Sequence, residues 1–312
     1  MVSSFRQYCY YAGWFFKSKL GKKRPLVNTM IIGYNCNLKC KHCSVIAHNS
    51  EIEGVHSLPY DTAIQEMKNE FENGARIIFF EGGEPTIWRD GDKTFPSLIS
   101  AAKDIGYYVI GYTTNGTGRI YEDCDVISVS LDGPKEIHDS IRGEGVFDKM
   151  MENISNLDHT NIFANLVVME QNKNHIRETL EIERDNPKIS GLMINFLTPP
   201  PHEIAISSEE RAAVIEDLLR FKKEGLPVLN TENALKELLV EDYSEKCPKF
   251  VSVFTIPDGS KFHGCPAEGT DSCKHCGFDA VREYRLILDF NIETVMKMSK
   301  QFALTNNNSK RS

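Results

Sequence analysis

The sequence predicts an α/β protein built around a parallel sheet, in the form of a partial, TIM-like (β/α)6 barrel that is open on one side. Between residues 27 and 224, short runs of β-branched and aromatic residues alternate six times with stretches of helical periodicity. Six such units are too few to close an eight-stranded barrel. The polar motifs of the chain follow the predicted strands, where the loops of such a barrel form a site.

The expected strands are short segments rich in valine, isoleucine, phenylalanine and tyrosine. They span 28–33, 76–80, 107–111, 126–130, 162–169 and 191–197. The stretches between them place apolar residues three or four positions apart, as on one face of a helix. These expected helices span 60–71, 95–105, 147–157, 175–183 and 208–223, and the interval 119–122 offers no good helix.

The predicted barrel, residues 25–225, lies between two segments of different character. Residues 1–24 are expected to form an amphipathic helix and a basic turn, and the βα alternation stops in the cysteine-bearing extension 226–304. The polar tail 305–312 is expected to be disordered.

The extension is predicted to contain its own short elements. We expect a helix at 233–240, a hairpin at Pro257-Asp-Gly259, where turn-forming residues cluster, and a last helix at 292–302. The long loop from Cys36 to Pro59, after the first strand, is expected to be functional because loops of that length usually are.

Composition excludes some functions. The chain has 312 residues with 36 basic and 44 acidic side chains, a formal charge of −8, which argues against a nucleic-acid partner. Nine cysteines occur without a signal peptide or a long apolar run. This pattern predicts a cytoplasmic protein, in whose reducing surroundings clustered cysteines are metal ligands more often than disulfides.

The N-terminal segment has two interpretations. Aromatic and small residues at helical spacing precede a basic cluster; they are Phe5, Tyr8, Tyr11, Ala12, Phe15 and Phe16, followed by Lys17, Lys19, Lys22, Lys23 and Arg24. This combination suits peripheral contact with a membrane surface. It also suits a terminal helix that packs on the domain and ends at Gly21.

A cysteine motif follows the first predicted strand, with Cys36, Cys40 and Cys43 spaced as Cys-x3-Cys-x2-Cys. A four-iron cluster normally takes four thiolates, so a loop that offers three leaves one iron without a protein ligand. Zinc sites also use close cysteine pairs. The spacing therefore predicts a metal site, with an open coordination position if the metal is an iron-sulfur cluster.

Three more motifs follow the next three strands: Glu81-Gly-Gly-Glu-Pro85, Thr113-Thr-Asn-Gly116 and Ser128-Val-Ser-Leu-Asp-Gly133. Together with the cysteine motif they resemble the radical S-adenosylmethionine (radical SAM) superfamily over residues 27 to about 224. The resemblance implies a 4Fe-4S cluster at which S-adenosylmethionine is reductively cleaved to a 5′-deoxyadenosyl radical. That radical would act on an unactivated carbon or double bond of a small-molecule or lipid substrate, with an electron donor such as ferredoxin or flavodoxin.

The resemblance also implies which residues hold S-adenosylmethionine. Gly82, Gly83 and Glu84 would receive the methionine ammonium group, and Pro85 would fix the turn. Arg142 would pair with the methionine carboxylate, although a surface ion pair is the ordinary alternative.

The nucleoside end is assigned in the same way. Ser130 and Asp132 would hold ribose hydroxyls, although Asp132-Gly-Pro134 is equally typical of a plain turn. Asn115, with Gly116, would shape the floor of the adenosine pocket, and His42 would lie beside the adenine. Asn165 and Asn195, on the fifth and sixth strands, are weaker candidates for the cavity wall.

A second cysteine set, Cys247, Cys265, Cys273 and Cys276, falls within thirty residues of the extension. Four thiolates make a closed site for a second iron-sulfur cluster or for structural zinc, and free thiols are a third interpretation. The segment resembles the C-terminal extensions of radical SAM enzymes that hold an auxiliary cluster, although it has fewer cysteines.

Several functions therefore remain open. The general layout is similar to lipid-modifying members such as the adenosylhopene synthases. An auxiliary cluster would suit a peptide- or protein-modifying enzyme instead. A non-catalytic iron-sulfur or zinc protein is the alternative from another class.

Overall fold

The computed structural model describes residues 2–43, 56–198 and 203–301. Its main sheet has eight strands in the order β10-β9-β1-β2-β5-β6-β7-β8. The last six strands of this order form the barrel; they are β1 (Val27–Ile31), β2 (Ile77–Glu81), β5 (Val109–Thr114), β6 (Val126–Ser130), β7 (Ile162–Val168) and β8 (Leu192–Phe196). Neighbours among these six pair in parallel, which confirms the predicted partial barrel.

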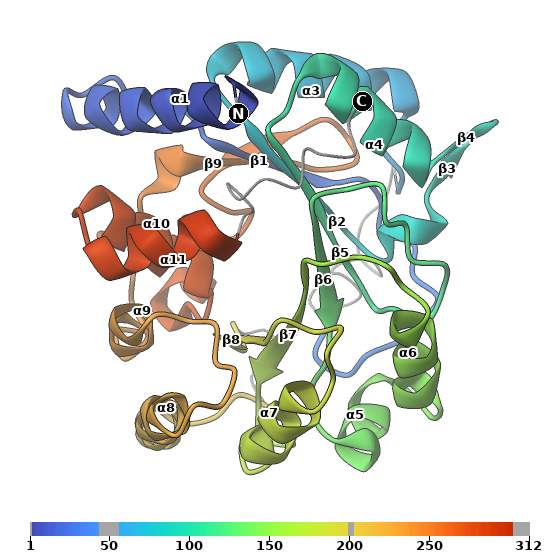
Figure 1. Cartoon of the computed structure of the whole chain (residues 1–312), viewed down its shortest axis with the longest axis vertical. Coiled ribbons are helices and arrows are strands. Elements are labelled where there is room, and N and C mark those ends of the chain that lie inside the picture. The colour runs from blue at the N-terminus through green and yellow to red at the C-terminus, as the bar shows by residue number, and fades with distance from the viewer. Residues whose placement is uncertain (1, 44–55, 199–202, 302–312) are drawn as a thin grey trace.

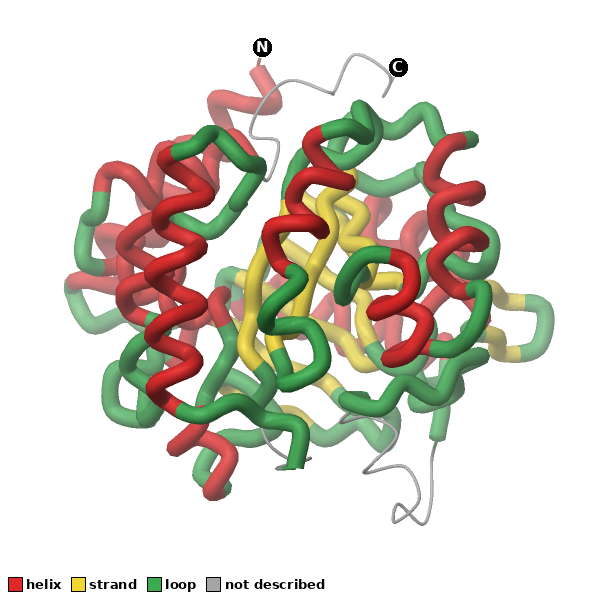
Figure 2. The backbone as a smooth tube through the Cα atoms, turned by 90° about the horizontal axis from the view of Figure 1, so that it is seen from below, coloured by secondary structure: helices red, strands yellow, loops and turns green. Residues whose placement is uncertain are grey.

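Helices surround the outside of this sheet, as Figures 1 and 2 show. They are α3 (Tyr60–Asn73), α4 (Phe95–Ile105), α5 (Lys135–Arg142), α6 (Val146–Ser155), α7 (Ile176–Arg184) and α8 (Ser208–Lys223). Helix α8 begins with a capping box in which Ser207 and Glu210 satisfy each other's backbone N–H groups. Helix α5 was not predicted, and β5 begins and ends later than the expected strand 107–111.

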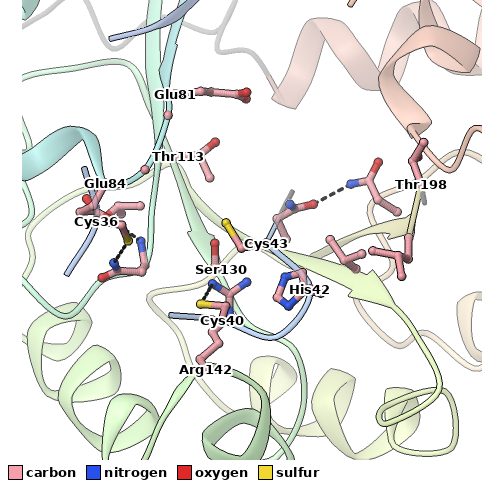
Figure 3. Close-up of a pocket in the computed structure, with 18 of the residues that line it drawn as sticks. Cys36, Cys40, His42, Cys43, Glu81, Glu84, Thr113, Ser130, Arg142 and Thr198 are labelled. Carbon is pink, nitrogen blue, oxygen red and sulfur yellow. Dashed lines mark hydrogen bonds between the residues drawn. The ribbon is translucent and has the colours of Figure 1, made fainter. Parts of the chain in front are cut away.

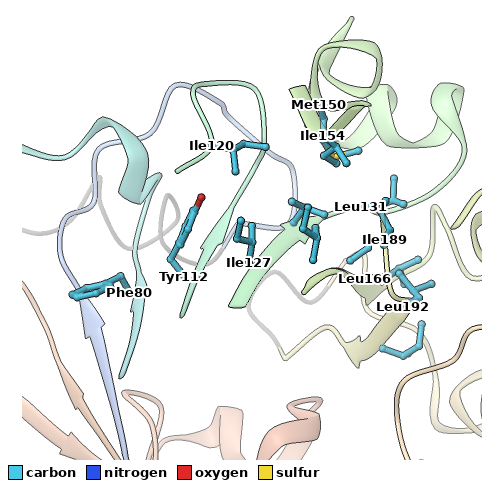
Figure 4. Close-up of a cluster of buried hydrophobic side chains, with 14 of the residues drawn as sticks. Phe80, Tyr112, Ile120, Ile127, Leu131, Met150, Ile154, Leu166, Ile189 and Leu192 are labelled. Atoms are coloured by element: carbon cyan, nitrogen blue, oxygen red, sulfur yellow. The ribbon is translucent and has the colours of Figure 1, made fainter. Parts of the chain in front are cut away.

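The strands bury both faces. Outward-facing side chains such as Phe80, Tyr112 and Ile127 are fully buried against the helices (Figure 4). The side chains at the alternate strand positions point inward and form a second apolar cluster inside the barrel, which includes Phe79 and Phe163. Because side chains alternate along a strand, the next inward positions toward the carboxyl ends lie above this inner cluster. Those positions include Glu81, Thr113, Ser130, Asn165 and Asn195 and are polar.

The extension continues the barrel sheet. Strand β9 (Ser252–Thr255) pairs in parallel with β1, and β10 (Lys261–His263) pairs antiparallel with β9, so the predicted hairpin is present. That this hairpin joins the edge of the barrel was not predicted. The division at residue 225 into barrel and extension therefore stays a prediction.

Three helices complete the extension: α9 (Glu232–Glu237), α10 (Asp279–Leu288) and α11 (Ile292–Gln301). Helix α10 was not predicted. The segment before it lies against the end of β8, where the Phe196 N–H donates to the Gly277 carbonyl at 2.9 Å. A Cβ at Gly277 would meet the Phe196 carbonyl oxygen at 1.8 Å, so only glycine fits this approach.

Helix α1 (Val2–Lys19) crosses the amino ends of the strands. The Tyr10 hydroxyl donates to the carbonyl of Gly74, just before β2, and the Trp14 indole donates to the carbonyl of Arg24, just before β1. Among the described residues, no helix is long and apolar enough to span a bilayer. The predicted tail 305–312 and residues 44–55 of the long loop lie outside the described residues.

Candidate active site

A cavity of about 380 Å³ opens at the carboxyl ends of the barrel strands. The three cysteines of the first motif, Cys36, Cys40 and Cys43, all line it (Figure 3). Its other predicted lining residues are His42, Gly82, Gly83, Glu84, Asn115, Ser130, Arg142, Asn165 and Asn195. The motifs that were far apart in the sequence thus meet at one place, as expected for loops at the same end of a parallel barrel.

The three thiols share this cavity but point in different directions. Cys36 lies beside Glu84, whereas Cys40 lies beside Arg142, whose Nη1 donates to Cys40 Sγ at 3.8 Å (Figure 3). Burial raises the pKa of Cys40 to about 11, with Arg142 acting in the opposite direction. In the described part of the chain, no three Cys, His, Asp or Glu side chains converge closely enough to hold a metal ion.

The donor set nevertheless fits a 4Fe-4S cluster with one open iron. Sulfur is the ligand such clusters take, and no fourth cysteine of the described residues lines the cavity. All three cysteines lie on one loop, and each side chain has other staggered rotamers available about χ1.

Glu84 connects the ends of two strands. Its carboxylate accepts hydrogen bonds from the Thr114 hydroxyl and the Asn115 N–H, both at 2.7 Å, and from the Thr86 hydroxyl at 2.7 Å. Only 3% of Glu84 is exposed, so a buried charge is held by several donors. Glu84 therefore fixes the loop after β2 against the loop after β5.

Gly82 and Gly83 are required by chain packing. A Cβ on Gly82 would meet the Gly33 carbonyl oxygen at 2.2 Å, and a Cβ on Gly83 would meet that of Asn35 at the same distance. The Gly83 N–H donates to the Gly33 carbonyl at 2.9 Å. The two glycines let the start of the cysteine loop lie directly on the end of β2.

Arg142 is positioned by Asp132. The Arg142 Nε donates to the Asp132 carboxylate at 2.6 Å, and the second carboxylate oxygen accepts from the Val167 N–H at 3.3 Å. Burial would raise the pKa of Asp132, but Arg142, His42 and His138 hold it below its usual value. The guanidinium is thus fixed at the cavity wall beside Cys40.

Two residues assigned to the cofactor site, Asp132 and Pro85, lie off the cavity wall in this structure. Asp132 has no exposed surface and is not on the cavity wall, because its carboxylate is turned toward Arg142. Pro85 is buried at the first position of the short 3-10 helix Pro85–Ile87, also away from the wall. Each supports a neighbouring residue of the wall and does not reach the cavity itself.

His42 reaches the cavity from the cysteine loop. Its Nε2 lies 3.7 Å from the Asp132 carboxylate, and its Nδ1 is buried without a hydrogen-bond partner in the described residues. Burial lowers the pKa of His42, only partly offset by Asp132. A neutral imidazole with an unused nitrogen is thus available to a ligand.

The far wall of the cavity is an amide network. Asn195 Nδ2 donates to Asn165 Oδ1 at 2.7 Å, and Asn195 Oδ1 accepts from the N–H of Asp279 at 2.8 Å. Asp279 is the first residue of α10, so this network ties the extension to the barrel mouth. Both asparagines therefore combine a local structural role with a position on the wall.

Glu81 also lines the cavity and was missed as a site residue. It occupies the last inward position of β2, near Thr113 and away from Arg142 (Figure 3). Its carboxylate has no hydrogen bond or ion pair recorded with any described residue, and burial raises its pKa to about 7. The alternation Ile77, Phe79, Glu81 would have identified it, since the first two belong to the inner cluster.

The second cysteine set gathers outside this cavity, in the extension. Burial raises the pKa of Cys247 to about 12, and Cys265, Cys276 and Cys273 each add to the shift. The pKa of Cys265 is raised to about 11 in the same way, by burial and then by the charges of Cys273 and Cys276. The four thiols are thus close enough to influence one another.

Two buried arginines approach this second set. Arg282 is fully buried, and its Nη1 donates to Cys276 Sγ at 3.1 Å. Arg211, 4% exposed, donates to the Cys276 carbonyl at 2.9 Å. Within the described ranges Arg282 makes no recorded ion pair, although its charge acts on the buried carboxyl of Asp279, and its other donors meet carbonyl oxygens. A positive charge is therefore held beside four thiols.

Comparison with known proteins agrees with this geometry. The model of the radical SAM superfamily matches residues 30–182. Fe-coproporphyrin III synthase from Methanosarcina barkeri is 32% identical over 46% of this chain and 36% of its own length. A cysteine-type anaerobic sulfatase-maturating enzyme from Clostridium novyi is 31% identical over 52% of this chain and 48% of its own. The matches thus span less than half of these relatives.

Solved structures agree in fold. A structure of anSMEcpe with bound AdoMet superimposes with a TM-score of 0.61 at 18% identity, over 88% of this chain and 79% of that one. Streptococcus suis SuiB bound to S-adenosylmethionine gives 0.59 at 15% identity, over 80% and 61%. At such identities the likeness establishes the fold alone. Four motifs at one barrel mouth, the family match and the shared fold together lead to one conclusion: residues 30–182 of the chain are a radical SAM domain.

Proposed function

We propose that the chain is an enzyme that cleaves S-adenosylmethionine reductively at a 4Fe-4S cluster held by Cys36, Cys40 and Cys43. One observation carries the proposal: all three cysteines line the same cavity as the polar groups from the ends of β2, β5 and β6. The cluster and S-adenosylmethionine would supply the 5′-deoxyadenosyl radical used on the substrate.

The residues of the chain would bind and orient the nucleotide. The guanidinium of Arg142, held by Asp132, suits the methionine carboxylate because its donors match carboxylate geometry. Ser130 offers a hydroxyl for the ribose, and the loop from Gly82 to Glu84 offers backbone groups for the ammonium. His42 would contribute a neutral ring beside the adenine.

Glu81 would face the substrate. It lies on the cavity wall away from Arg142, toward α10 (Figure 3). Tyr284 of α10 is near enough that the charge of Glu81 adds to burial in raising the pKa of Tyr284. A carboxyl group without a recorded partner in the described residues would accept a hydrogen bond from a hydroxyl or amine of the substrate. The reaction would take place on an unactivated carbon or double bond of that molecule.

The second cysteine set is proposed to hold an auxiliary iron-sulfur cluster. The support is the buried positive charge of Arg282, which donates to Cys276 Sγ and compensates the negative charge that thiolates bring to a buried site; Arg211, nearby, is paired with Glu241. Zinc with four thiolates carries the same net charge, so zinc is the alternative. Free thiols would not need this compensation.

A peptide or protein is the second candidate substrate class. Mycofactocin maturase MftC from Mycolicibacterium smegmatis is 29% identical over 55% of this chain, and SuiB has been solved with its precursor peptide. A lipid or other small molecule remains the first candidate from the sequence. Either reaction would require an electron donor such as ferredoxin or flavodoxin.

The test uses anaerobic protein reconstituted with iron and sulfide. Dithionite and S-adenosylmethionine should give 5′-deoxyadenosine, measured by liquid chromatography, and Cys40→Ala should abolish it. Cys124→Ala, a cysteine outside both sets, is the matched control. Unchanged cleavage by Cys40→Ala would disprove the proposed function and favour a non-catalytic role.

Iron and zinc analysis of the same protein distinguishes the three interpretations of the second cysteine set. About eight irons per chain would indicate two 4Fe-4S clusters, and about four with one zinc would indicate structural zinc. About four irons without zinc would leave the second cysteines as free thiols.

A further inference from the structure

An apolar surface is exposed where α1 meets the turn between α10 and α11. Phe16 and Leu20 are 63% and 79% exposed, and Phe290 and Ile292 are 63% and 65% exposed. The ring of Phe15 joins the two parts, because its centroid lies 5.6 Å from that of Phe16 and 5.7 Å from that of Phe290. Segments from opposite ends of the chain thus form one surface, which we call the α1–α11 patch.

The outer face of α1 is not needed to hold the helix in place. Tyr10 and Trp14 do that from the inner face, through the hydrogen bonds that precede β2 and β1. Phe5, Ala12 and Phe16 follow one another at helical spacing on the other face, and all three are exposed. The helix therefore carries two apolar faces, of which the barrel covers only one.

The turn that presents Phe290 is itself unusual. Phe290 is the only non-glycine residue of the described chain with a positive φ, at 61°. A bulky residue rarely adopts this conformation, and here the side chain gains little burial in return. This conformation ends α10 in a Schellman motif, in which the Asn291 N–H donates to the Leu286 carbonyl at 2.9 Å, and it leaves the Phe290 ring on the surface.

The charge beside the patch is strongly positive. Lys17, Lys19, Lys22, Lys23 and Arg24 are all exposed, and the first 50 residues contain no aspartate or glutamate, although the whole chain carries −8. The acidic groups of the neighbouring helices are engaged elsewhere. Asp289 pairs with Arg285, and Glu293 accepts hydrogen bonds from the start of α9.

We propose that the α1–α11 patch docks on the headgroup layer of an anionic phospholipid bilayer, with its aromatic side chains inserted and the basic cluster against the lipid phosphates. Large apolar side chains bordered by lysine and arginine are the combination that binds such an interface. A second copy of the chain is a poorer occupant, because a symmetric contact would bring two basic clusters together.

Docking at this place would leave the cavity free. Helix α1 lies at the amino ends of the strands, and the cavity opens at their carboxyl ends. Substitutions in the patch should therefore change lipid binding without changing cleavage of S-adenosylmethionine. The proposal does not depend on the substrate or on the proposed reaction.

The experiment is flotation of the reconstituted full chain with vesicles. One set is phosphatidylcholine alone, and in the other about a third of the lipid is phosphatidylglycerol. The chain should float with the anionic vesicles, and added salt should release much of it because the basic cluster acts through screened charge. Phosphatidylcholine vesicles should bind at least about tenfold less.

Two double variants test the apolar side chains and the basic cluster separately. Phe16→Ser with Leu20→Ser, and Lys22→Glu with Lys23→Glu, should each lower binding to the anionic vesicles about tenfold or more. Leu239→Ser, half exposed on the extension, and Lys223→Glu, exposed at the end of α8, are the matched controls and should bind like the native chain. Circular dichroism confirms that each variant is folded.

Failure of the native chain to float with anionic vesicles at low salt would overturn the proposal. So would native-like binding by either double variant. A dimer in solution that only the Phe16 and Leu20 variant dissociates, with no vesicle binding, would assign the patch to a second copy of the chain instead.

Discussion

The two cysteine sites of this chain differ in the partner of the nearby arginine and in whether the thiols line an open cavity. At the first, three thiols line an open cavity, and the nearby guanidinium of Arg142 is already paired with Asp132. At the second, four thiols gather in the extension beside Arg282, whose Nη1 donates to Cys276 Sγ. An arginine that is bonded to a carboxylate leaves the first site free to accept an outside ligand, whereas an arginine that donates to a thiol suits a closed site that keeps its own negative charge.

The largest expected effect comes from removing a ligand of the open site. Cys40→Ala should eliminate formation of 5′-deoxyadenosine, since it removes one of the three thiolates proposed to hold the cluster. Cys273→Ala should retain cleavage without substrate. If both variants lose cleavage equally, the two sites are not independent and the comparison fails.

The next effect concerns the buried charge of the second site. Arg282→Met should remove about half of the iron and lower the free energy of unfolding by roughly 2 to 4 kcal/mol, because several buried carbonyl groups lose their donor. Metal analysis and urea unfolding measure the two quantities. Met is close to Arg in length, so packing changes least.

Arg282→Lys is the matched control, since it keeps the charge and loses the fork of donors. It should retain more iron than Arg282→Met. Full iron content in Arg282→Met would show that the second site does not need the positive charge.

A smaller effect is expected at the open site from Asp132→Asn. Without the carboxylate, Arg142 is no longer held at the wall, and the affinity for S-adenosylmethionine should fall about tenfold, equivalent to about 1.4 kcal/mol. Equilibrium dialysis of the reconstituted protein measures it. Asp139→Asn is the control and should bind normally, because Asp139 lies on α5 with Arg142 but accepts from the N–H groups of Gly145 and Phe147. Equal losses in both variants would point to a general effect on α5.

The smallest effect concerns the pH dependence of stability at Glu81. Burial raises the pKa of Glu81 from 4.5 to about 7, so between these values the folded state binds more protons than the unfolded state. Its contribution to stability is present below about pH 4.5 and is lost as the pH rises through about 7. Allowing for its contact with solvent in the cavity, the loss is about 2 kcal/mol.

Glu81→Gln keeps the shape and removes the titration, so the difference in unfolding free energy between variant and native protein should grow from pH 5 to pH 8. Taking this difference cancels the other buried carboxyls, Asp279 and Glu283, whose pKa values are also raised by burial. A difference that does not change with pH would contradict a buried, unpartnered Glu81.

Much of the barrel could be predicted because its signals are local. Apolar runs predicted β1, β2, β6, β7 and β8 to within two residues at each end. Helix α10 was missed because its buried residues include Asp279, Arg282 and Glu283, which break an apolar pattern. Helix α5 was missed because its eight residues follow a Gly-Pro turn and offer few apolar positions.

The site was predicted in outline for the same reason. Motifs identified the lining residues, but not that Asp132 would turn from the cavity toward Arg142, since that depends on a helix that was not predicted. Glu81 follows from strand parity and could have been identified. The approach of Arg282 to Cys276 is a tertiary contact with no local signal. The assignments of Cys36, Cys40, Cys43 and the second set as metal ligands stay predictions.

Electron paramagnetic resonance of the reduced, reconstituted protein, with and without S-adenosylmethionine, tests the open iron most directly. The protein should carry Cys273→Ala and Cys276→Ala so that any signal from the second site is removed. We predict that adding the nucleotide changes the spectrum of the remaining cluster. An unchanged spectrum at saturating nucleotide, or the absence of any cluster signal, would contradict the account.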